Sequence, residues 1–345
     1  MEGTSKDIIT ISLDAMGSDD APVTEVAGAV ETVNEIRDMN IILVGDSAGI
    51  DKELKKYSYD KKKIRVHHAS EVIGMHDSPT EALKKKPDSS IRVGLELHKQ
   101  KEADAFISSG NTGAIMAASL LTLGRIANVT RPTIGQEFPT DTGTSILFDV
   151  GANMDCKPVY LLEFALMGVI YANHLFNVEN PRIALLNVGE EKTKGNALSI
   201  EAYERFEKSG LNFIGNIEGS EVLKGEAEVI VCDGFVGNVL MKFTESVPGV
   251  LKNKFKDYTK GSIFKKLWVG MMYGTLKKVL KGFDYEEFGG VPLLGVDGIS
   301  IIGHGKSTAK AVKNMILKAE KMHRLKINDI IRDRIIDIKQ FYSTN

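Results

Sequence analysis

The sequence predicts an α/β protein built around a mostly parallel, doubly wound sheet. Short apolar runs of strand character alternate along the 345-residue chain with longer segments of helical period. The strand-like runs lack polar alternation, which is typical of parallel strands covered by helices on both faces. We expect one domain over residues 1–345, either undivided or as two lobes around one cleft.

The expected elements follow in chain order from these two periodicities. Eight apolar runs are expected to form the sheet: 8–13, 41–44, 64–66, 105–108, 145–150, 182–188, 228–231 and 299–302. Seven segments carry apolar residues at helical spacing: 22–37, 89–99, 114–123, 159–176, 197–208, 236–246 and 307–323. Because helices separate most of the strands, the strands are expected to run parallel.

Charge and composition exclude several classes of protein. The chain has 44 Lys and Arg residues against 46 Asp and Glu residues, whereas nucleic-acid-binding domains normally show a basic excess. Hydrophobic residues make up 43% and charged residues 26%, which excludes wholesale disorder. We therefore expect a globular protein that does not bind nucleic acid.

Cysteine usage and the lack of long apolar stretches indicate the compartment. Cys156 and Cys232 lie far apart in the sequence, without a CxxC motif or a His at ligand spacing, so neither a disulfide scaffold nor a zinc site is expected. The N-terminus has no signal-peptide pattern, and no run of about 18 apolar residues could span a bilayer. We expect a soluble, cytoplasmic protein with reduced thiols.

Glycine and small polar residues gather directly after the strands. These strand ends combine Gly with Asn, Asp, Thr, His or Glu, at 14–17, 45–46, 109–113, 151–153, 189–191, 232–234 and 303–305. Any one of them could be an ordinary turn. Ligands of open α/β sheets bind outside the carboxyl ends of the strands, so together these turns predict a binding site along that edge.

Three short stretches match known functional motifs, but each match is weak evidence for the function of its motif. Residues 45–49 fit G-x-S-x-G, the nucleophile elbow of hydrolases, with Ser47 as nucleophile and His304 as a formal downstream partner. Residues 303–308 end like a Walker A loop, but Ser300 stands where its first Gly belongs. The same stretch is an imperfect dinucleotide fingerprint, and it comes too late in the chain for a leading nucleotide-binding unit.

Three other segments favour a site that handles phosphate. Residues 108–114 combine a strand end, a Gly/Asn turn and a helix start, which directs backbone N–H groups and the helix dipole toward an anion. Residues 188–196 place Lys192 and Lys194 before another helix, although a solvated turn explains the lysines equally well. In 233–238, Asp233 and Asn238 bracket glycines.

These segments carry a family resemblance. The chain resembles the bacterial phosphate acyltransferases, which are the phosphate:acyl-carrier-protein acyltransferases of phospholipid synthesis. The matching blocks span almost the whole chain in one order: ISLDAMG at 11–17, SGNTGA at 109–114, DVGANMDCKP at 149–158, LNVGEE at 186–191, TKGN at 193–196, NFIGNIEG at 212–219, VCDGFVGN at 231–238, GVPLLG at 290–295 and IGHG at 302–305. Ser18 and Asp20 depart from the family pattern, which more often has Gly and His or Asn there.

The resemblance implies fold, reaction and partners. It implies a three-layer α/β/α fold similar to phosphotransacetylases and isopropylmalate-dehydrogenase-like proteins, acting as a homodimer without metal or nucleotide cofactor. The implied reaction is acyl-carrier protein thioester plus inorganic phosphate, giving acyl phosphate and free carrier protein. The product would pass to a membrane glycerol-3-phosphate acyltransferase, and the enzyme would associate peripherally with the inner face of the cell membrane.

The resemblance also implies site residues. Lys194 and Asn238 match the pair that the family uses for catalysis. Our hypothesis is that Lys194 neutralises phosphate and the developing charge, while Asn238 donates to the carbonyl oxygen or orients phosphate. The candidates for binding phosphate or substrate are Asp14, Gly110, Asn111, Thr112, Gly113 and His304. Phosphate is already an anion and a thiolate is a good leaving group, so no conspicuous nucleophile is required.

One segment has a charge profile unlike the rest. Residues 251–281 hold nine lysines against one acid, Asp257, which leaves the remaining chain near −10. Within the segment, apolar residues at helical spacing lie beside the lysines, and the candidates for membrane contact are Phe264, Leu267, Trp268 and Met271. An apolar stripe beside a lysine face is typical of an interfacial membrane helix. A dimer interface and a docking face for the acidic carrier protein are the alternatives.

Three other functions remain open at this point. They are a phosphotransacetylase that uses acyl-CoA, a hydrolase built on Ser47, and a non-catalytic protein that binds acyl groups or the carrier. Phosphate-dependent thiol release, a serine-directed inhibitor and binding without turnover distinguish them.

Overall fold

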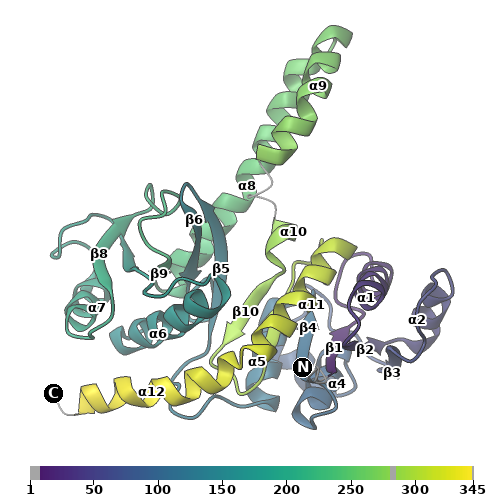
Figure 1. Cartoon of the computed structure of the whole chain (residues 1–345), viewed down its shortest axis with the longest axis horizontal. Coiled ribbons are helices and arrows are strands. Elements are labelled where there is room, and N and C mark those ends of the chain that lie inside the picture. Colours follow the sequence, from purple (N-terminus) through teal and green to yellow (C-terminus); the bar gives the residue numbers. More distant parts are fainter. Residues whose placement is uncertain (1–7, 280–284, 344–345) are drawn as a thin grey trace, which may run out of the picture.

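One continuous sheet forms the centre of the protein, and helices cover it (Figure 1). The structure is a computed structural model that describes residues 8–279 and 285–343. Its strands are β1 (Ile9–Asp14), β2 (Met39–Gly45), β3 (Ile64–His68), β4 (Ala105–Ser108), β5 (Thr133–Thr140), β6 (Gly143–Phe148), β7 (Ile183–Asn187), β8 (Phe213–Glu218), β9 (Val229–Val231), β10 (Val291–Leu294) and β11 (Ser300–Ile302). The 11 strands lie in the order β3-β2-β1-β4-β11-β10-β5-β6-β9-β7-β8. All eight expected strands are present, and the predicted α/β class is confirmed.

The sheet contains two parallel groups of opposite direction. In the first group, β3, β2, β1, β4 and β11 run parallel, and in the second group β6, β9, β7 and β8 run parallel. Between them, β10 pairs antiparallel with β11 and with β5, and β5 pairs antiparallel with β6. These three reversals turn the carboxyl ends of the two groups toward opposite edges of the sheet.

This arrangement corrects the expectation of one common edge of strand ends. The sequence did not predict β5, β8 and β10, and two of these strands, β5 and β10, cause the difference. Strand β10 contains Pro292, and β5 contains Gly135 and Pro139, all poor residues for regular strands. In β8, Gly215 has φ of +109° at an irregular pairing with β7. Packing within the sheet outweighs these weak local preferences.

The helices are α1 (Val23–Glu35), α2 (Ser47–Leu54), α3 (Pro79–Lys85), α4 (Ser90–Lys99), α5 (Thr112–Thr122), α6 (Pro158–Leu175), α7 (Ala197–Glu207), α8 (Gly234–Thr259), α9 (Ile263–Val279), α10 (Tyr285–Phe288), α11 (Ala309–Arg324) and α12 (Ile327–Ser343). The seven expected helices are all present within a few residues, except that the helix expected to end at 246 continues to Thr259. Pro248 lies inside it, so a proline does not end this helix. Helices α2, α3, α10 and α12 were not expected.

One part of the core lies between the sheet and helix α6. By length and composition α6 could cross a membrane, but 67% of it is buried inside the protein. Phe164 and Tyr171 are fully buried, and Tyr171 donates its hydroxyl to Glu137 of β5 at 2.6 Å. Its apolar sequence is therefore explained by its place as a core helix of the second strand group.

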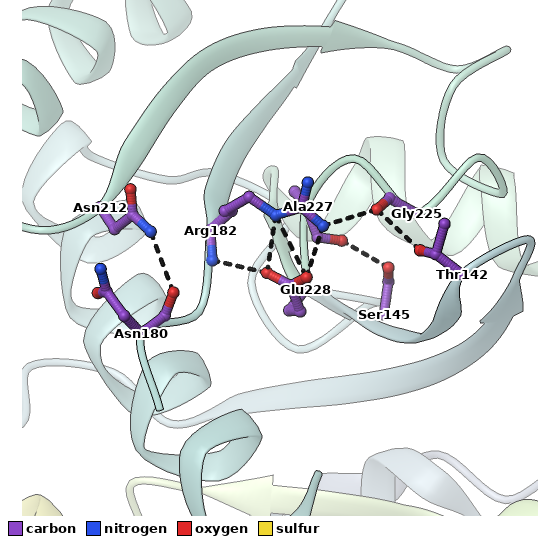
Figure 2. A network of polar contacts seen from close by, with 8 residues as sticks. All are labelled: Thr142, Ser145, Asn180, Arg182, Asn212, Gly225, Ala227 and Glu228. Atoms are coloured by element: carbon purple, nitrogen blue, oxygen red, sulfur yellow. Dashed lines mark hydrogen bonds and ion pairs between the residues drawn. The ribbon is translucent and has the colours of Figure 1, made fainter. Parts of the chain in front are cut away.

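A polar network ties the amino ends of the second strand group together (Figure 2). Arg182, just before β7, donates to the Glu228 carboxylate at 2.6 Å and to the Gly225 carbonyl at 2.8 Å. Thr142 donates to the same carbonyl at 3.1 Å. Burial alone would raise the pKa of Glu228, but the hydrogen bonds from Arg182 hold it below its ordinary value. The network fixes the starts of these strands, at the opposite side of the sheet from their own carboxyl ends.

Helices α8 and α9 form a hairpin that projects away from the body of the protein (Figure 1). Gly261, with φ of +79°, lies in the turn between them. The expected membrane contacts on α9 are exposed: Phe264 by 85%, Leu267 by 61%, Trp268 by 55% and Met271 by 76%. Of the basic segment 251–281, Leu280 and Lys281 lie outside the described residues.

Candidate active site

Asp14 lies at the carboxyl end of β1, beside the end of β4. Its carboxylate accepts hydrogen bonds from the Ser108 hydroxyl at 2.6 Å and the Met16 backbone N–H at 3.0 Å. Burial raises the pKa of Asp14 above its ordinary value, although these hydrogen bonds oppose the shift. A Cβ on Gly17 would lie 2.7 Å from the Gly110 nitrogen, so the loops after β1 and β4 meet only because Gly17 has no side chain.

Asn111 fixes the start of α5. Its side-chain oxygen caps the helix by accepting from the Ala114 N–H at 3.1 Å. Its amide nitrogen donates to three carbonyls in the loop before α3, those of Gly74, Met75 and Asp77, at 3.0–3.2 Å. Asn111 is therefore a positioning group, and the exposed Thr112 and half-buried Gly113 form the first turn itself.

The carboxyl ends of β1, β4 and β11 form one edge of the sheet, which we call the first edge. The loop after β11 completes it. The Gly303 N–H donates to the Ser108 carbonyl at 2.8 Å, and the Asp19 N–H donates to the Gly305 carbonyl at 2.7 Å. His304 between them is exposed, and its Nδ1 accepts from the Lys306 N–H at 3.1 Å. The structure thus brings together the strand-end loops that hold the predicted residues Asp14, Gly110, Asn111, Thr112, Gly113 and His304.

Glu25 is a buried acid near this first edge that sequence analysis missed. It lies on α1, and one of its carboxylate oxygens accepts from the Ser18 N–H at 3.0 Å. Burial, with the charge of Asp14 nearby, raises its pKa to about 7. A Glu in the first turn of a helix has no sequence signal that separates it from a surface acid, because only the fold buries it.

The carboxyl ends of β6, β9 and β7 form the opposite edge of the sheet, which we call the second edge. Asp149, directly after β6, organises this edge. This carboxylate is fully buried and accepts from the backbone N–H groups of Gly151, Ala152 and Asn153 at 2.8–3.1 Å. The Asn153 side chain adds a hydrogen bond at 2.6 Å. Burial raises the pKa of Asp149, against the effect of its hydrogen bonds. Asp149 and Asn153 lie in a family block of the sequence, but nothing there marked them as the organisers of this loop.

Helix α8 starts at this second edge and positions Asn238. Asp233 caps the helix by accepting from the Val236 N–H at 2.9 Å, and the Gly234 N–H donates to the Asn153 carbonyl at 2.8 Å. A Cβ on Gly237 would lie 1.9 Å from the Asp149 carbonyl oxygen. The first turn of α8 therefore packs directly on the 149–153 loop and places Asn238 beside Gly151.

Lys194 lies in the loop that follows β7, the neighbour of β9. Asn187, at the end of β7, donates to the Lys194 carbonyl at 3.0 Å, and Asn216 of β8 donates to the Glu191 carbonyl at 3.1 Å. Gly195 has φ of +96°, which suits glycine, and Asn196 then caps α7. Two asparagines from two strands thus hold the loop that carries Lys194.

Lys192 and Lys194, the two lysines of this loop, have different contacts. Lys192 is paired with Glu207 of α7, and its ammonium lies 5.4 Å from the Tyr203 ring centroid. Lys194 is half exposed, and its Nζ lies 3.9 Å from a Glu191 oxygen, the weaker of the two contacts. Lys192 is therefore anchored to α7, whereas Lys194 has only the longer contact with Glu191 in its own loop.

The strand directions divide the predicted site residues into two groups. Lys194 and Asn238 follow β7 and β9, which are neighbouring parallel strands, so both lie at the second edge together with Asp149. Asp14, the 110–113 turn and His304 follow β1, β4 and β11 and lie at the first edge. The single edge that the sequence suggested is thus two edges of one sheet.

The weaker sequence patterns have structural explanations. Ser47 begins α2, where Asp46 caps the helix by accepting from the Ala48 and Gly49 N–H groups at 3.2 Å. Residues 303–308 connect β11 to α11, which Thr308 caps. Within residues 8–279 and 285–343, no group of three or more His, Cys, Asp or Glu side chains is spaced to hold a metal ion.

Two free cysteines lie at the second edge. Cys156 donates its thiol to the Asn153 carbonyl at 3.5 Å, and Cys232 is buried beneath Asp149. Burial and the nearby carboxylate of Asp149 raise the pKa of Cys156 to about 12. Burial raises the pKa of Cys232 as well. Both thiols are therefore protonated at neutral pH and are poor nucleophiles.

Comparison with known proteins gives one consistent family. A family model described as "Fatty acid synthesis protein" matches residues 9–329. A phosphate acyltransferase of Dictyoglomus turgidum is 49% identical over 320 residues, which cover 92% of this chain and 95% of that protein. A phosphate acyltransferase of Acetivibrio thermocellus is 44% identical over 329 residues, covering 95% and 97%.

Solved structures with the same fold are more distant in sequence. A phosphotransacetylase from Streptococcus pyogenes aligns with a TM-score of 0.62 at 15% identity, covering 92% of this chain and 94% of that chain. A branched-chain phosphotransacylase from Enterococcus faecalis aligns with a TM-score of 0.56 at 15% identity, covering 91% and 99%. These likenesses confirm the predicted three-layer α/β/α fold.

Proposed function

The chain belongs to the phosphate acyltransferase family of fatty acid synthesis proteins, and on this premise we propose the chemistry of its site. The protein is an acyltransferase of lipid synthesis. We propose that it transfers a fatty acyl group from acyl-carrier protein to inorganic phosphate, giving acyl phosphate and the free carrier thiol. The observation that carries the site assignment is the arrival of Lys194 and Asn238 at one sheet edge, after the neighbouring strands β7 and β9.

In the proposed reaction a phosphate oxygen attacks the thioester carbonyl carbon. The carbonyl π electrons move to oxygen and form a tetrahedral oxyanion, which collapses with expulsion of the carrier thiolate. Lys194 neutralises the incoming phosphate, and the Asn238 side-chain amide donates to the oxyanion. The first turn of α8 adds the positive end of its helix dipole near Asn238.

The acyl group is proposed to pass directly to phosphate, without an acyl-enzyme intermediate. The thiols nearest Asp149 belong to Cys156 and Cys232, and the raised pKa values of both keep them protonated at neutral pH. Because phosphate is already an anion, the reaction needs only positioning and charge stabilisation. The glycine-rich turn of the first edge, which contains Gly110 and Gly113, is proposed to bind phosphate or another anionic group of the substrate.

Thiol release from an acyl-carrier protein tests this function. We expect release to require inorganic phosphate and to be faster with acyl-carrier protein than with acyl-CoA. A serine-directed inhibitor is expected to leave the rate unchanged, because Ser47 is the first residue of α2, after the capping Asp46. Release without phosphate would contradict the proposal, and a preference for acyl-CoA would indicate a phosphotransacetylase. Binding of the carrier without any turnover would instead support a non-catalytic protein.

The α8–α9 hairpin is proposed to join two copies of the chain and to meet the membrane. On α8, Val239, Phe243 and Val250 are more than half exposed, and a second copy would cover this apolar face.

On α9, Phe264, Leu267 and Met271 recur at helical spacing beside Lys265 and Lys266. This pattern supports peripheral attachment to the inner face of the membrane, near the glycerol-3-phosphate acyltransferase that would use the product.

Trp268→Asp tests the membrane proposal. We expect the variant to bind anionic phospholipid vesicles at least about tenfold more weakly than the wild type, because a charge replaces a large apolar side chain at the interface. Vesicle flotation measures the bound fraction, and Tyr57→Asp, which changes an exposed aromatic residue on another part of the surface, is the control. Unchanged flotation would count against the proposal, and a loss of dimer with flotation intact would assign α9 to the dimer interface.

A further inference from the structure

A pocket of about 450 Å³ opens between α5 and α6, beside the second edge. Its lining consists of Leu120, Arg125, Thr130, Arg131, Pro132 and Tyr160. We propose that this pocket binds the phosphodiester of the prosthetic arm through which the carrier protein holds its acyl group. The proposal rests on the function proposed above and adds the place where the carrier's arm enters.

Two guanidinium groups give the pocket its charge. The Arg125 side chain donates to the Thr130 carbonyl at 2.5 Å, and the Arg131 guanidinium lies 5.9 Å from the Tyr160 ring centroid. In the part of the chain that the structure describes, neither forms an ion pair with a carboxylate. Arginine matches the geometry of phosphate oxygens, so the pair is suited to a phosphodiester anion.

The pocket is rigid because buried contacts hold its wall. Glu163 of α6 is fully buried and accepts from the Thr130 N–H at 2.8 Å and from the Thr130 hydroxyl at 2.6 Å. The Ile126 N–H donates to the Gly295 carbonyl at 3.0 Å. The loop that carries Arg125 and Arg131 is thus fixed to α6 and to the turn after β10, and little ordering is needed when a ligand binds.

A short chain of contacts leads from the pocket to Asn238. The Asn153 side chain donates to the carbonyl of Pro132, a lining residue, at 2.8 Å. The Asn153 carbonyl in turn accepts from the Gly234 N–H at the start of α8. Asn238 lies one turn further along this helix. The pocket and the proposed catalytic amide therefore share one structural unit.

The chemistry of the arm fits this arrangement. The arm has an anionic phosphodiester at one end and the acyl thioester at the other, so its two ends must bind at separate points of one surface. The arginines would hold the anionic end, while Leu120, Pro132 and Tyr160 provide an apolar wall for the intervening chain. The thioester end would then reach Asn238 along the second edge.

Comparison of carrier protein with and without its arm tests the proposal. Fluorescence anisotropy measures binding of both forms to the full-length wild type, to Arg131→Gln and to the double variant Arg125→Gln/Arg131→Gln. We expect both variants to bind the arm-bearing carrier at least about tenfold more weakly than the wild type does. Their affinity for the arm-free carrier is expected to be unchanged. Arg65→Gln, an exposed arginine on the edge strand β3, is the control. Arg131→Gln keeps the proposal testable if loss of the Arg125 contact impairs folding.

The other outcomes overturn the proposal. Equal weakening of both carrier forms would mean that the arginines contact acidic side chains of the carrier, and no weakening would mean that the pocket is not used. In turnover assays, we expect the KM for acyl-carrier protein to rise and the KM for phosphate to stay the same. A rise in the phosphate KM alone would make the pocket the inorganic phosphate site. If the wild-type enzyme showed no phosphate-dependent thiol release, the proposed function itself would be refuted. The binding comparison does not depend on turnover, so it tests the pocket separately.

Discussion

Replacing Lys194 with Ala is expected to lower kcat for phosphate-dependent thiol release by about a hundredfold to a thousandfold. Such losses are typical when one group that stabilises transition-state charge is removed. The Lys194 side chain is half exposed and lies 3.9 Å from Glu191, so its removal should barely change stability. Steady-state kinetics and the thermal unfolding midpoint measure the two effects separately.

Lys192→Ala provides a matched control in the same loop. Lys192 is held by Glu207 on α7, so its loss should leave kcat within a few-fold of the wild-type value. Near wild-type turnover in Lys194→Ala would remove Lys194 from the mechanism. Equal losses in both variants would show that the loop needs positive charge in general and not the Lys194 ammonium.

Gly237→Ala is expected to reduce kcat by about a hundredfold and to destabilise the fold by about 1–3 kcal/mol. An added Cβ would lie 1.9 Å from the Asp149 carbonyl oxygen, so the first turn of α8 must move away from the 149–153 loop. Asn238 would move with it, and a displacement of about 1 Å at a reacting group can cost that much in rate. Kinetics together with denaturant unfolding measure both losses.

Gly249→Ala is the control for this helix. An added Cβ at Gly249 meets no neighbouring atom within 4 Å, and alanine in a helix is favoured over glycine by about 0.5–1 kcal/mol. We expect this variant to keep full activity with equal or slightly higher stability. A Gly237→Ala enzyme with normal kcat would show that the placement of Asn238 does not depend on the contact with Asp149.

Local sequence patterns predicted the strands and helices better than they predicted the arrangement of the sheet. Long apolar runs such as 145–150 and periodic helices such as 309–324 carry their own signal. Strands β5 and β10 do not, because Pro139 and Pro292 interrupt them and neighbouring strands supply their stability. Since these two strands reverse the direction of the sheet, missing them also hid its second edge.

The site was predictable in its residues but not in its grouping. The motifs containing Asp14, Asn111, Lys194 and Asn238 stand out in the sequence, and the structure places each at a strand end. Asp149 and Glu25 carry no such signal, because their importance comes from burial and from hydrogen bonds across the fold. Arg125 and Arg131 likewise form a pair only because one loop folds between α5 and α6.

The source of the oxygen in the product distinguishes attack by phosphate from hydrolysis of the thioester. Acyl-carrier protein is incubated with the enzyme and isotopically labelled phosphate, and the acyl product is identified by mass spectrometry. Direct attack by phosphate predicts one acyl phosphate per released thiol, with all of the labelled phosphate oxygens retained. Release of free fatty acid carrying solvent oxygen, at the same rate with and without phosphate, would contradict direct attack by phosphate.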